Sequence, residues 1–303
     1  MTFVGAAATV GAMFRGTFTA LVTPFRNGDV DPAAFEKLIE AQIAAGISGL
    51  VAVGTTGESP TLTHAEKEEL IAATVKIASG RCKVLAGTGT NSTRDSIEAT
   101  KFAEKAGADG ALVVAPYYNK PSQEGLFRHF KAIAEATSLP IMLYNIPGRC
   151  SVDIFPETVV RLAEDCRNIV AIKEASGSVE RVGELRRRLP DEFSILSGDD
   201  SLTLPFMSVG AAGVVSVASN LFPADVCTLV RTCEAADLKR AGQLHRKLLP
   251  LFKDLFIEPN PVPVKTALAW RGVMSHEVRL PLCEMTEANQ ARLRKTIEEL
   301  CRQ

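Results

Sequence analysis

The sequence predicts a closed (β/α)8 barrel followed by a small C-terminal helical appendage. Eight short β-branched or apolar runs alternate with amphipathic segments of helical length, which indicates a parallel sheet. The chain has 303 residues, 46% of them hydrophobic, and can bury a core of barrel size. Eight such units in about 220 residues favour a closed barrel over an open doubly wound sheet, which typically uses fewer strands.

The predicted strands are the eight apolar runs. They cover residues 17–22, 50–53, 83–86, 111–114, 141–143, 169–172, 194–196 and 213–216. Helices are predicted between them, among others at 35–44, 66–78, 97–105 and 126–136.

Capping residues support these helices. Asp31 precedes Pro32 as an N-cap, and Thr63 and Glu66 have the spacing of a capping box. Glycines stand where three helices should end, namely Gly46, Gly80 and Gly107.

The pattern divides the chain into three parts. Residues 1–13 are expected to be a disordered extension, and they lack the basic start of a secretion signal. Residues 14–235 are expected to form the (β/α)8 barrel. Residues 236–303 hold three helices, at 237–256, 262–271 and 287–300, which should pack on the barrel.

Composition excludes several classes of function. With 34 Lys and Arg against 35 Asp and Glu, no global field recruits nucleic acid or a membrane, and Arg186 to Arg188 indicate the solvated face of a helix. The seven cysteines include no C-x-x-C pair and the four histidines are dispersed, so we expect no disulfide framework and no metal site. A cytoplasmic protein is expected.

Lys173 closes an apolar run at the predicted end of the sixth strand. A lysine there commonly just returns the chain to water, because lysine is rarely fully buried. At the mouth of an apolar barrel, however, its pKa should fall and leave a nucleophilic amine near neutral pH. Such an amine suits Schiff-base chemistry with a ketone.

Other polar residues fall at strand ends, where barrels assemble their active sites. They are Thr55, Thr56, Tyr117, Tyr118 and Tyr144, and Gly198 also follows a predicted strand there. Taken singly, the threonines could form only a tight turn and Tyr144 could be a core aromatic. Arg149 suits a carboxylate clamp or a loop ion pair, and Asp199 with Asp200 favours a helix N-cap. Phosphate binding near Gly210 is a weak alternative, since those glycines precede the last strand.

Six ordered motifs resemble the 4-hydroxy-tetrahydrodipicolinate synthase family, also called dihydrodipicolinate synthases. The resemblance runs from about residue 14 to the C-terminus. The motifs are GTTGES at 54–59, PYYNKP at 116–121, YNIPGR at 144–149, IKEASG at 172–177, LSGDD at 196–200 and EPNP at 258–261.

The resemblance implies a lyase that condenses pyruvate with L-aspartate 4-semialdehyde on the route to diaminopimelate and lysine. Lys173 would form the pyruvate imine, and Tyr144 would move protons with Thr55 and with Tyr118 of a neighbouring subunit. Thr56, Gly198 and Val215 would bind pyruvate, and Arg149 the semialdehyde. The resemblance further implies no cofactor and a homotetramer built from tight dimers, with a dimer left open.

Sister pyruvate-imine lyases remain alternatives, namely N-acetylneuraminate lyase and the 2-keto-3-deoxy sugar acid aldolases, as does a catalytically silent barrel used as a binding module. The Thr55-Thr56 pair and Arg149 favour the synthase, and Cys150-Ser151 departs from its pattern without removing a catalytic group. The family's lysine-inhibitor site is matched by four residues, Ser59, His64, Asn91 and Tyr117. Lys67 and Asp95 depart from it, so we expect weak or no inhibition by lysine.

Overall fold

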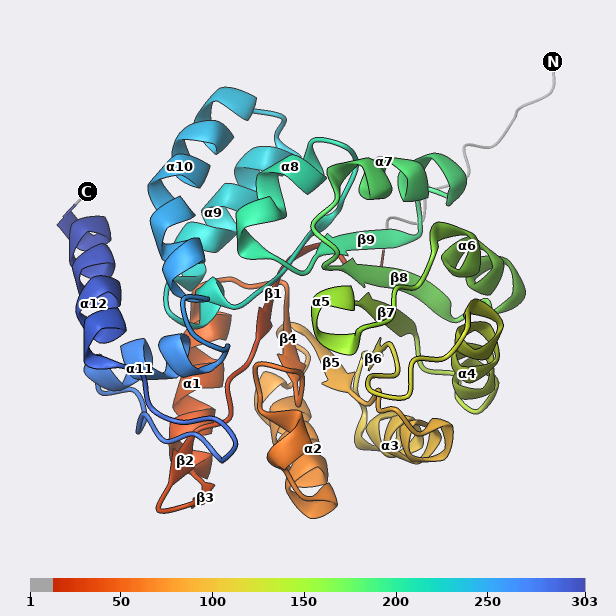
Figure 1. The fold of residues 1–303 in the computed structure, drawn as a ribbon, viewed down its shortest axis with the longest axis horizontal. Helices are drawn as coiled ribbons and strands as arrows, with labels where there is room; N and C mark the ends of the chain where they lie inside the picture. Colours follow the sequence, from red (N-terminus) through yellow and green to blue (C-terminus); the bar gives the residue numbers. More distant parts are fainter. Residues whose placement is uncertain (1–12, 303) are drawn as a thin grey trace.

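The computed structural model describes residues 13–302 and contains a closed barrel of eight parallel strands (Figure 1). The barrel closes where the first strand pairs with both the second and the last. In chain order the strands are β1 (Gly16–Ala20), β4 (Gly49–Ala52), β5 (Lys83–Gly87), β6 (Gly110–Val114), β7 (Ile141–Asn145), β8 (Ile169–Glu174), β9 (Ser194–Ser197) and β10 (Gly213–Ser216). All eight predicted strands are confirmed, with ends within two residues of those expected.

A two-stranded hairpin was not predicted. It joins β2 (Phe25–Arg26) to β3 (Asp29–Val30) beside the barrel. Strands of two residues are too short to show a periodic pattern. The turn between them is Asn27-Gly28, and an Asn-Gly pair is the usual sequence signal for a tight hairpin. Both residues have positive φ, as such a turn requires.

Helices surround the barrel, as Figure 1 shows. Those of the barrel are α1 (Pro32–Ala44), α2 (His64–Ala78), α3 (Thr93–Ala106), α4 (Gln123–Glu135), α5 (Pro147–Cys150), α6 (Pro156–Asp165), α7 (Val179–Arg188), α8 (Thr203–Met207) and α9 (Pro223–Glu234). Three short 3-10 turns lie at Ser59–Thr61, Asp200–Leu202 and Ala218–Asn220.

The predicted caps are present. Asp31 accepts a hydrogen bond from the backbone of Ala34, and both bonds of the Thr63 and Glu66 capping box are made. Gly107 is the C-cap of α3, and Gly46 and Gly80 follow the C-caps of α1 and α2, all three with positive φ.

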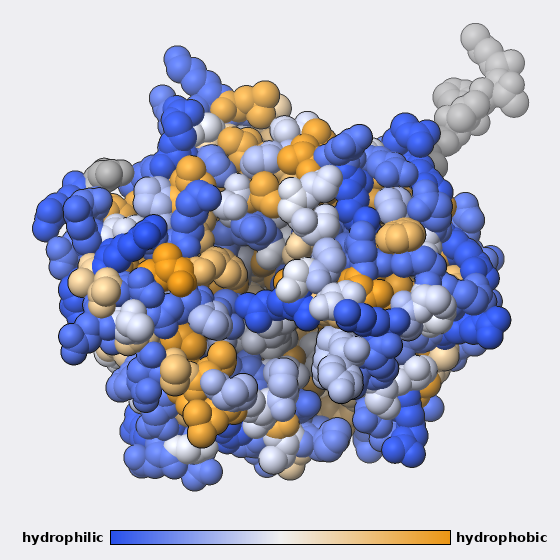
Figure 2. Space-filling model, viewed as in Figure 1, coloured by the Kyte–Doolittle hydropathy of each residue, from blue (hydrophilic) through white to orange (hydrophobic). Residues whose placement is uncertain are grey.

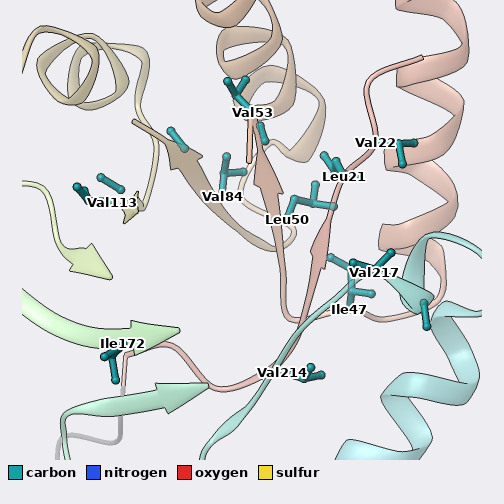
Figure 3. Packing of buried hydrophobic residues seen from close by; sticks show 14 of the residues in the cluster. Leu21, Val22, Ile47, Leu50, Val53, Val84, Val113, Ile172, Val214 and Val217 are labelled. Carbon is teal, nitrogen blue, oxygen red and sulfur yellow. The ribbon is translucent and has the colours of Figure 1, made fainter. Parts of the chain in front are cut away.

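Two hydrophobic cores form because successive strand residues point to opposite sides of the sheet. One fills the barrel and includes Phe18, Leu85, Met142 and Tyr144. The other lies between strands and helices, and Figure 3 shows part of it, including Leu50 and Val214. Side chains therefore fill the interior of the barrel, and the polar residues lie at the carboxyl ends of its strands.

The C-terminal helices are α10 (Leu238–Asp254), α11 (Val262–Trp270) and α12 (Glu287–Arg302). They follow the barrel as expected, and α10 packs on α9 while α12 packs on α10 and α11. Arg292 and Thr296 both bond Asp254, which ties α12 to the end of α10.

The expectation for the basic run at the end of α7 was wrong in part. Arg187 is exposed, but Arg186 donates to the backbone carbonyls of Leu189 and Phe193, each at 2.9 Å. A guanidinium near a helix C-terminus can satisfy carbonyls that have no partner within the helix. Arg186 thus shapes the chain between α7 and β9.

Residues 1–12 of the expected N-terminal extension lie outside the described residues, and Met13 is exposed. The face drawn in Figure 2 is largely hydrophilic, with scattered hydrophobic side chains. Within residues 13–302 no helix has the length and hydropathy to cross a membrane.

Candidate active site

Tyr144 and Lys173 stand opposite each other at the ends of β7 and β8. They are partners in the parallel register, and both are buried. The Lys173 Nζ lies 4.1 Å from the centre of the Tyr144 ring. An amine and a phenol are thus brought together at the carboxyl end of the barrel, where such folds carry their active sites.

The Lys173 amine is held in a form suited to nucleophilic attack. Burial lowers the pKa of Lys173 to about 7, opposed by the negative charge of Asp200 and assisted by the positive charge of Arg149. A substantial fraction of the amine is therefore unprotonated near neutral pH. The apolar residues of β8 that precede Lys173 bury its amine, which is the desolvation that the sequence predicts.

Gly198 and Val215 lie close to this pair. A side chain on Gly198 would come within 3.0 Å of the Lys173 Cε and 2.7 Å of the Ala175 Cβ, so glycine leaves room for the lysine stem. Val215, on β10, is buried in the same interior cluster as Tyr144. The structure thus brings both predicted residues to the site, with a packing reason for Gly198.

The turn after β4 carries the two threonines. Thr55 is half-buried, and its hydroxyl partly offsets a rise in the pKa of Tyr144 to about 12 that burial causes. The turn begins at Val53 and ends at Glu58, which have φ of 58° and 55°. Left-handed backbone at a β-branched residue is a true outlier, and such strain persists only where the surroundings hold it in place.

Two buried contacts from the C-terminal region hold that turn, and sequence reasoning missed both. The Asn260 Nδ2 donates to the Thr56 Oγ1 at 2.9 Å, and the Lys265 Nζ lies 2.6 Å from the Glu58 Oε1. Lys265 is fully buried and lies 4.2 Å from the Phe25 ring centre. The sequence could have indicated a buried lysine here, since Lys265 is the one charged residue of the apolar helix α11.

A second buried network lies behind Tyr144 and Lys173. Asn145 donates to both oxygens of Glu174, at 3.1 and 3.2 Å, and Arg181 on α7 donates its Nε to Glu174 at 2.7 Å. Asn145 also donates to Asp153 at 2.8 Å and accepts from the backbone of Ile154 at 3.0 Å. The ends of β7 and β8 are thereby joined to each other and to the segment after α5.

The predicted N-cap role holds for only one of the two aspartates after β9. Asp199 accepts from Ser201 N at 2.7 Å and caps the following turn. Asp200 is buried instead, and it accepts from Ser216 Oγ and from the backbone of Val217 and Ala218. Burial raises the pKa of Asp200 to about 6, although these three bonds oppose the rise.

A cavity of about 240 Å³ opens beside Tyr144. Its lining includes Thr55, Tyr144, Arg149, Tyr117, Ser59 and Lys67. Arg149 is exposed and sits on the short helix α5, which begins at Pro147 directly after β7. Tyr118 points elsewhere: 89% of it is exposed, and it makes no side-chain hydrogen bond to residues 13–302.

The predicted inhibitor-site residues gather around Lys67. Lys67 lines the cavity above, with Ser59 and Tyr117, and also a neighbouring one of about 220 Å³ with His64 and Asp95. Burial lowers the pKa of Lys67, opposed by the charge of Asp95. Asn91 lines neither cavity, and its carbonyl accepts a hydrogen bond from Asn119.

The whole arrangement is suited to carbonyl chemistry. A buried amine supplies a nucleophile, a neutral phenol can give and take protons, and a guanidinium can hold a carboxylate. No group of three or more His, Cys, Asp or Glu side chains suited to a metal ion occurs within the described part of the chain.

Comparison with known proteins identifies the family. The sequence model described as the dihydrodipicolinate synthetase family matches residues 13–300. The 4-hydroxy-tetrahydrodipicolinate synthase of Endomicrobium trichonymphae is 52% identical over 287 residues, covering 95% of this chain and 98% of that protein.

Solved structures agree. The 4-hydroxy-tetrahydrodipicolinate synthase of Methylacidiphilum fumariolicum SolV is 58% identical, with a TM-score of 0.94 over 95% of this chain and 96% of that one. A monomeric variant of dihydrodipicolinate synthase is 43% identical, with a TM-score of 0.94 over 95% and 97%. With a match over nearly its whole length, this chain belongs to the dihydrodipicolinate synthetase family.

Proposed function

We propose that this chain is a lyase that condenses pyruvate with L-aspartate 4-semialdehyde to give 4-hydroxy-tetrahydrodipicolinate, in the synthesis of diaminopimelate and lysine. The observation that carries the mechanism is the buried Lys173 amine, with a pKa of about 7, 4.1 Å from the ring centre of Tyr144. Membership of the family supports the substrates.

The reaction begins when the free Lys173 amine attacks the ketone carbon of pyruvate. Loss of water gives the imine, whose protonated nitrogen draws electrons from the methyl carbon as that carbon loses a proton. The resulting enamine carbon attacks the aldehyde carbon, and the new alkoxide takes up a proton. The amino group of the semialdehyde then attacks the imine carbon, closes the ring and releases the Lys173 amine.

Tyr144 serves the proton transfers of these steps. Because burial raises its pKa to about 12, the phenol stays neutral and can donate a proton before accepting one back. Thr55 lines the same cavity as Tyr144, its hydroxyl lowers the pKa of the phenol, and it continues the relay. No cofactor is needed, since the imine nitrogen itself accepts the electrons.

Carboxylate binding divides between two groups. Thr56 and the backbone near Gly198 and Val215 bind pyruvate. Gly198 packs against the Lys173 side chain, and Val215 lies in the same interior cluster as Tyr144. Arg149 binds the carboxylate of the semialdehyde, because its guanidinium lines the open cavity beside Tyr144.

The enzyme acts as a homo-oligomer, a tetramer of tight dimers, in which Tyr118 reaches the relay of a neighbouring subunit. The exposure of 89% of Tyr118 supports this, since a large aromatic side chain in water is ready for a partner. One relative is a monomeric variant, so the oligomeric state of this chain should be measured in solution. The cytoplasm is the proposed location, in keeping with seven free cysteines.

The decisive experiment is turnover with pyruvate and L-aspartate 4-semialdehyde, set beside N-acetylneuraminate and a 2-keto-3-deoxy sugar acid. Borohydride added with pyruvate should leave a stable adduct on the peptide that contains Lys173. Preference for a sugar acid would reassign the substrate, and an adduct elsewhere or none at all would refute the mechanism.

A further inference from the structure

We infer that Asn260, in the C-terminal region, is a positioning residue that directs the Thr56 hydroxyl proton towards the carboxylate of bound pyruvate. The inference rests on the proposed function and adds a group that the barrel itself does not supply. It starts from one contact between residues 204 positions apart, the bond from Asn260 Nδ2 to Thr56 Oγ1 at 2.9 Å.

The direction of this hydrogen bond sets the role of Thr56. An amide nitrogen only donates, so Thr56 is the acceptor in this contact. A hydroxyl has a single proton, and with its oxygen occupied by Asn260 that proton is free for another acceptor. The acceptor in the proposed reaction is the pyruvate carboxylate, held beside Lys173.

Asn260 makes little sense as a purely structural residue. Its side chain is buried, and its Oδ1 has no hydrogen-bond partner within residues 13–302. The bond to Thr56 is the only one that the side chain makes there. A buried amide left half-satisfied weakens a fold, so the contact with Thr56, and not a gain in stability, is the role that the geometry supports for Asn260.

The surroundings fix the Thr56 end of the contact. Thr56 lies in the turn between Val53 and Glu58, whose left-handed residues leave it little freedom. Lys265 and the backbone N–H of Arg279 both bond Glu58 at the end of the same turn, so the C-terminal region contacts the turn at three points. The position of the hydroxyl oxygen is therefore set by the turn, and the direction of its proton by Asn260.

The test is a double-mutant cycle read by borohydride trapping of the pyruvate imine on Lys173 at increasing pyruvate concentrations. Asn260→Ala should raise the half-saturating pyruvate concentration about 5- to 30-fold, since a charged acceptor loses an oriented donor. KM for the semialdehyde should change less than about twofold. In the Thr56→Val background the same Asn260→Ala change should have no further effect.

Asn260→Asp keeps the shape and gives a second reading if the alanine variant folds poorly. A carboxylate only accepts, so it takes the Thr56 proton and adds a repulsive charge, and the pyruvate requirement should rise further than with alanine. Glu66→Gln is the matched control. It weakens another link to the C-terminal region, the 2.5 Å pair with Arg279, without touching Thr56, and should leave the pyruvate requirement unchanged.

Each outcome decides. An unchanged pyruvate requirement in both Asn260 variants, or an equal effect of Asn260→Ala with and without Thr56, overturns the inference while the proposed function stands. A rise of the same size in Glu66→Gln assigns the effect to general loosening and also overturns it. A wild-type enzyme that forms no pyruvate adduct overturns the proposed function, and the inference with it.

Discussion

Asn145 and Glu174 hydrogen-bond across β7 and β8, each one residue beyond a member of the Tyr144 and Lys173 pair. Because side chains alternate along a strand, the first two lie behind the sheet while the other two point into the barrel. Arg181 completes the contact through Glu174, which is fully buried. The spacing of phenol and amine is therefore fixed from the outside of the barrel.

Glu174→Gln should destabilise the protein and reduce kcat. The change leaves the mostly buried Arg181 guanidinium with Asp153, at 3.3 Å, as its one remaining ion-pair partner within residues 13–302. Removing one member of a buried ion pair costs about 3–5 kcal/mol of unfolding free energy, measurable by urea denaturation. Glu157→Gln on the neighbouring helix α6 removes an exposed partner of Arg188 and is the control. Equal losses in the two variants would contradict a special role for the buried network.

Imine formation should depend on pH through Lys173. Its pKa lies near 7 in the folded protein, against 10.5 for an ordinary lysine, so the free amine increases as pH rises through 7. The rate of borohydride-trapped adduct formation at fixed pyruvate should climb from pH 6 and level off about one unit above the pKa. A rate that still climbs tenfold per unit at pH 9 would show that the amine is not desolvated.

Arg149→Ala should impair use of the semialdehyde more than imine formation with pyruvate. Arg149 lines the cavity beside Tyr144 and is exposed, so its bond to a carboxylate should contribute about 1.5–3 kcal/mol. That is roughly a 10- to 150-fold loss in kcat/KM for the semialdehyde. Steady-state kinetics with each substrate varied in turn would measure it, and equal damage to both substrates would count against the assignment.

Tyr118 should act in a site of the neighbouring subunit. Tyr118→Phe and Lys173→Ala should each be nearly inactive alone. Mixed after reversible dissociation, they should recover activity, because some hybrid sites then contain both wild-type groups. Tyr118 is 89% exposed in the single chain, which leaves it free to cross an interface. Demonstrated hybrids without recovery would place Tyr118 outside the partner's site.

L-lysine should inhibit the enzyme weakly or not at all. Lys67 lies in the cavity with Ser59 and Tyr117, so an inhibitor's ammonium group would meet a second cation. Two like charges about 4 Å apart cost roughly 4 kcal/mol at an effective dielectric of 20, and about 1 kcal/mol in water. The affinity for lysine should therefore be several-fold to about a thousandfold lower than in a site without this second cation.

Initial rates at fixed substrates and rising lysine concentrations test this expectation. Lys67→His, which removes the fixed charge, should strengthen inhibition. Clear inhibition of the wild type by sub-millimolar lysine would show that Lys67 swings out of the cavity and that the substitution was misinterpreted.

The strands were predictable because their buried runs are continuous and separated by helices of regular length. The positions of Lys173 and Tyr144 followed, since every strand end of a barrel lies on one face. Asp200 was not predictable as a buried group, because a sequence pattern does not distinguish it from Asp199 as a cap. Nor could Asn260 be paired with Thr56, since nothing in local periodicity connects residues 204 positions apart.

The grip of the C-terminal region on the turn after β4 has a consequence for biosynthesis of the chain. All eight strands and Lys173 precede residue 217, whereas Asn260 and Lys265, which bond Thr56 and Glu58 of the turn, come later. When only the barrel has emerged from the ribosome, the nascent chain already contains Lys173, but Thr56 still lacks its hydrogen bond from Asn260. Competence to use pyruvate should be acquired late, once α11 has emerged and docked, and a nascent barrel would not consume substrate prematurely.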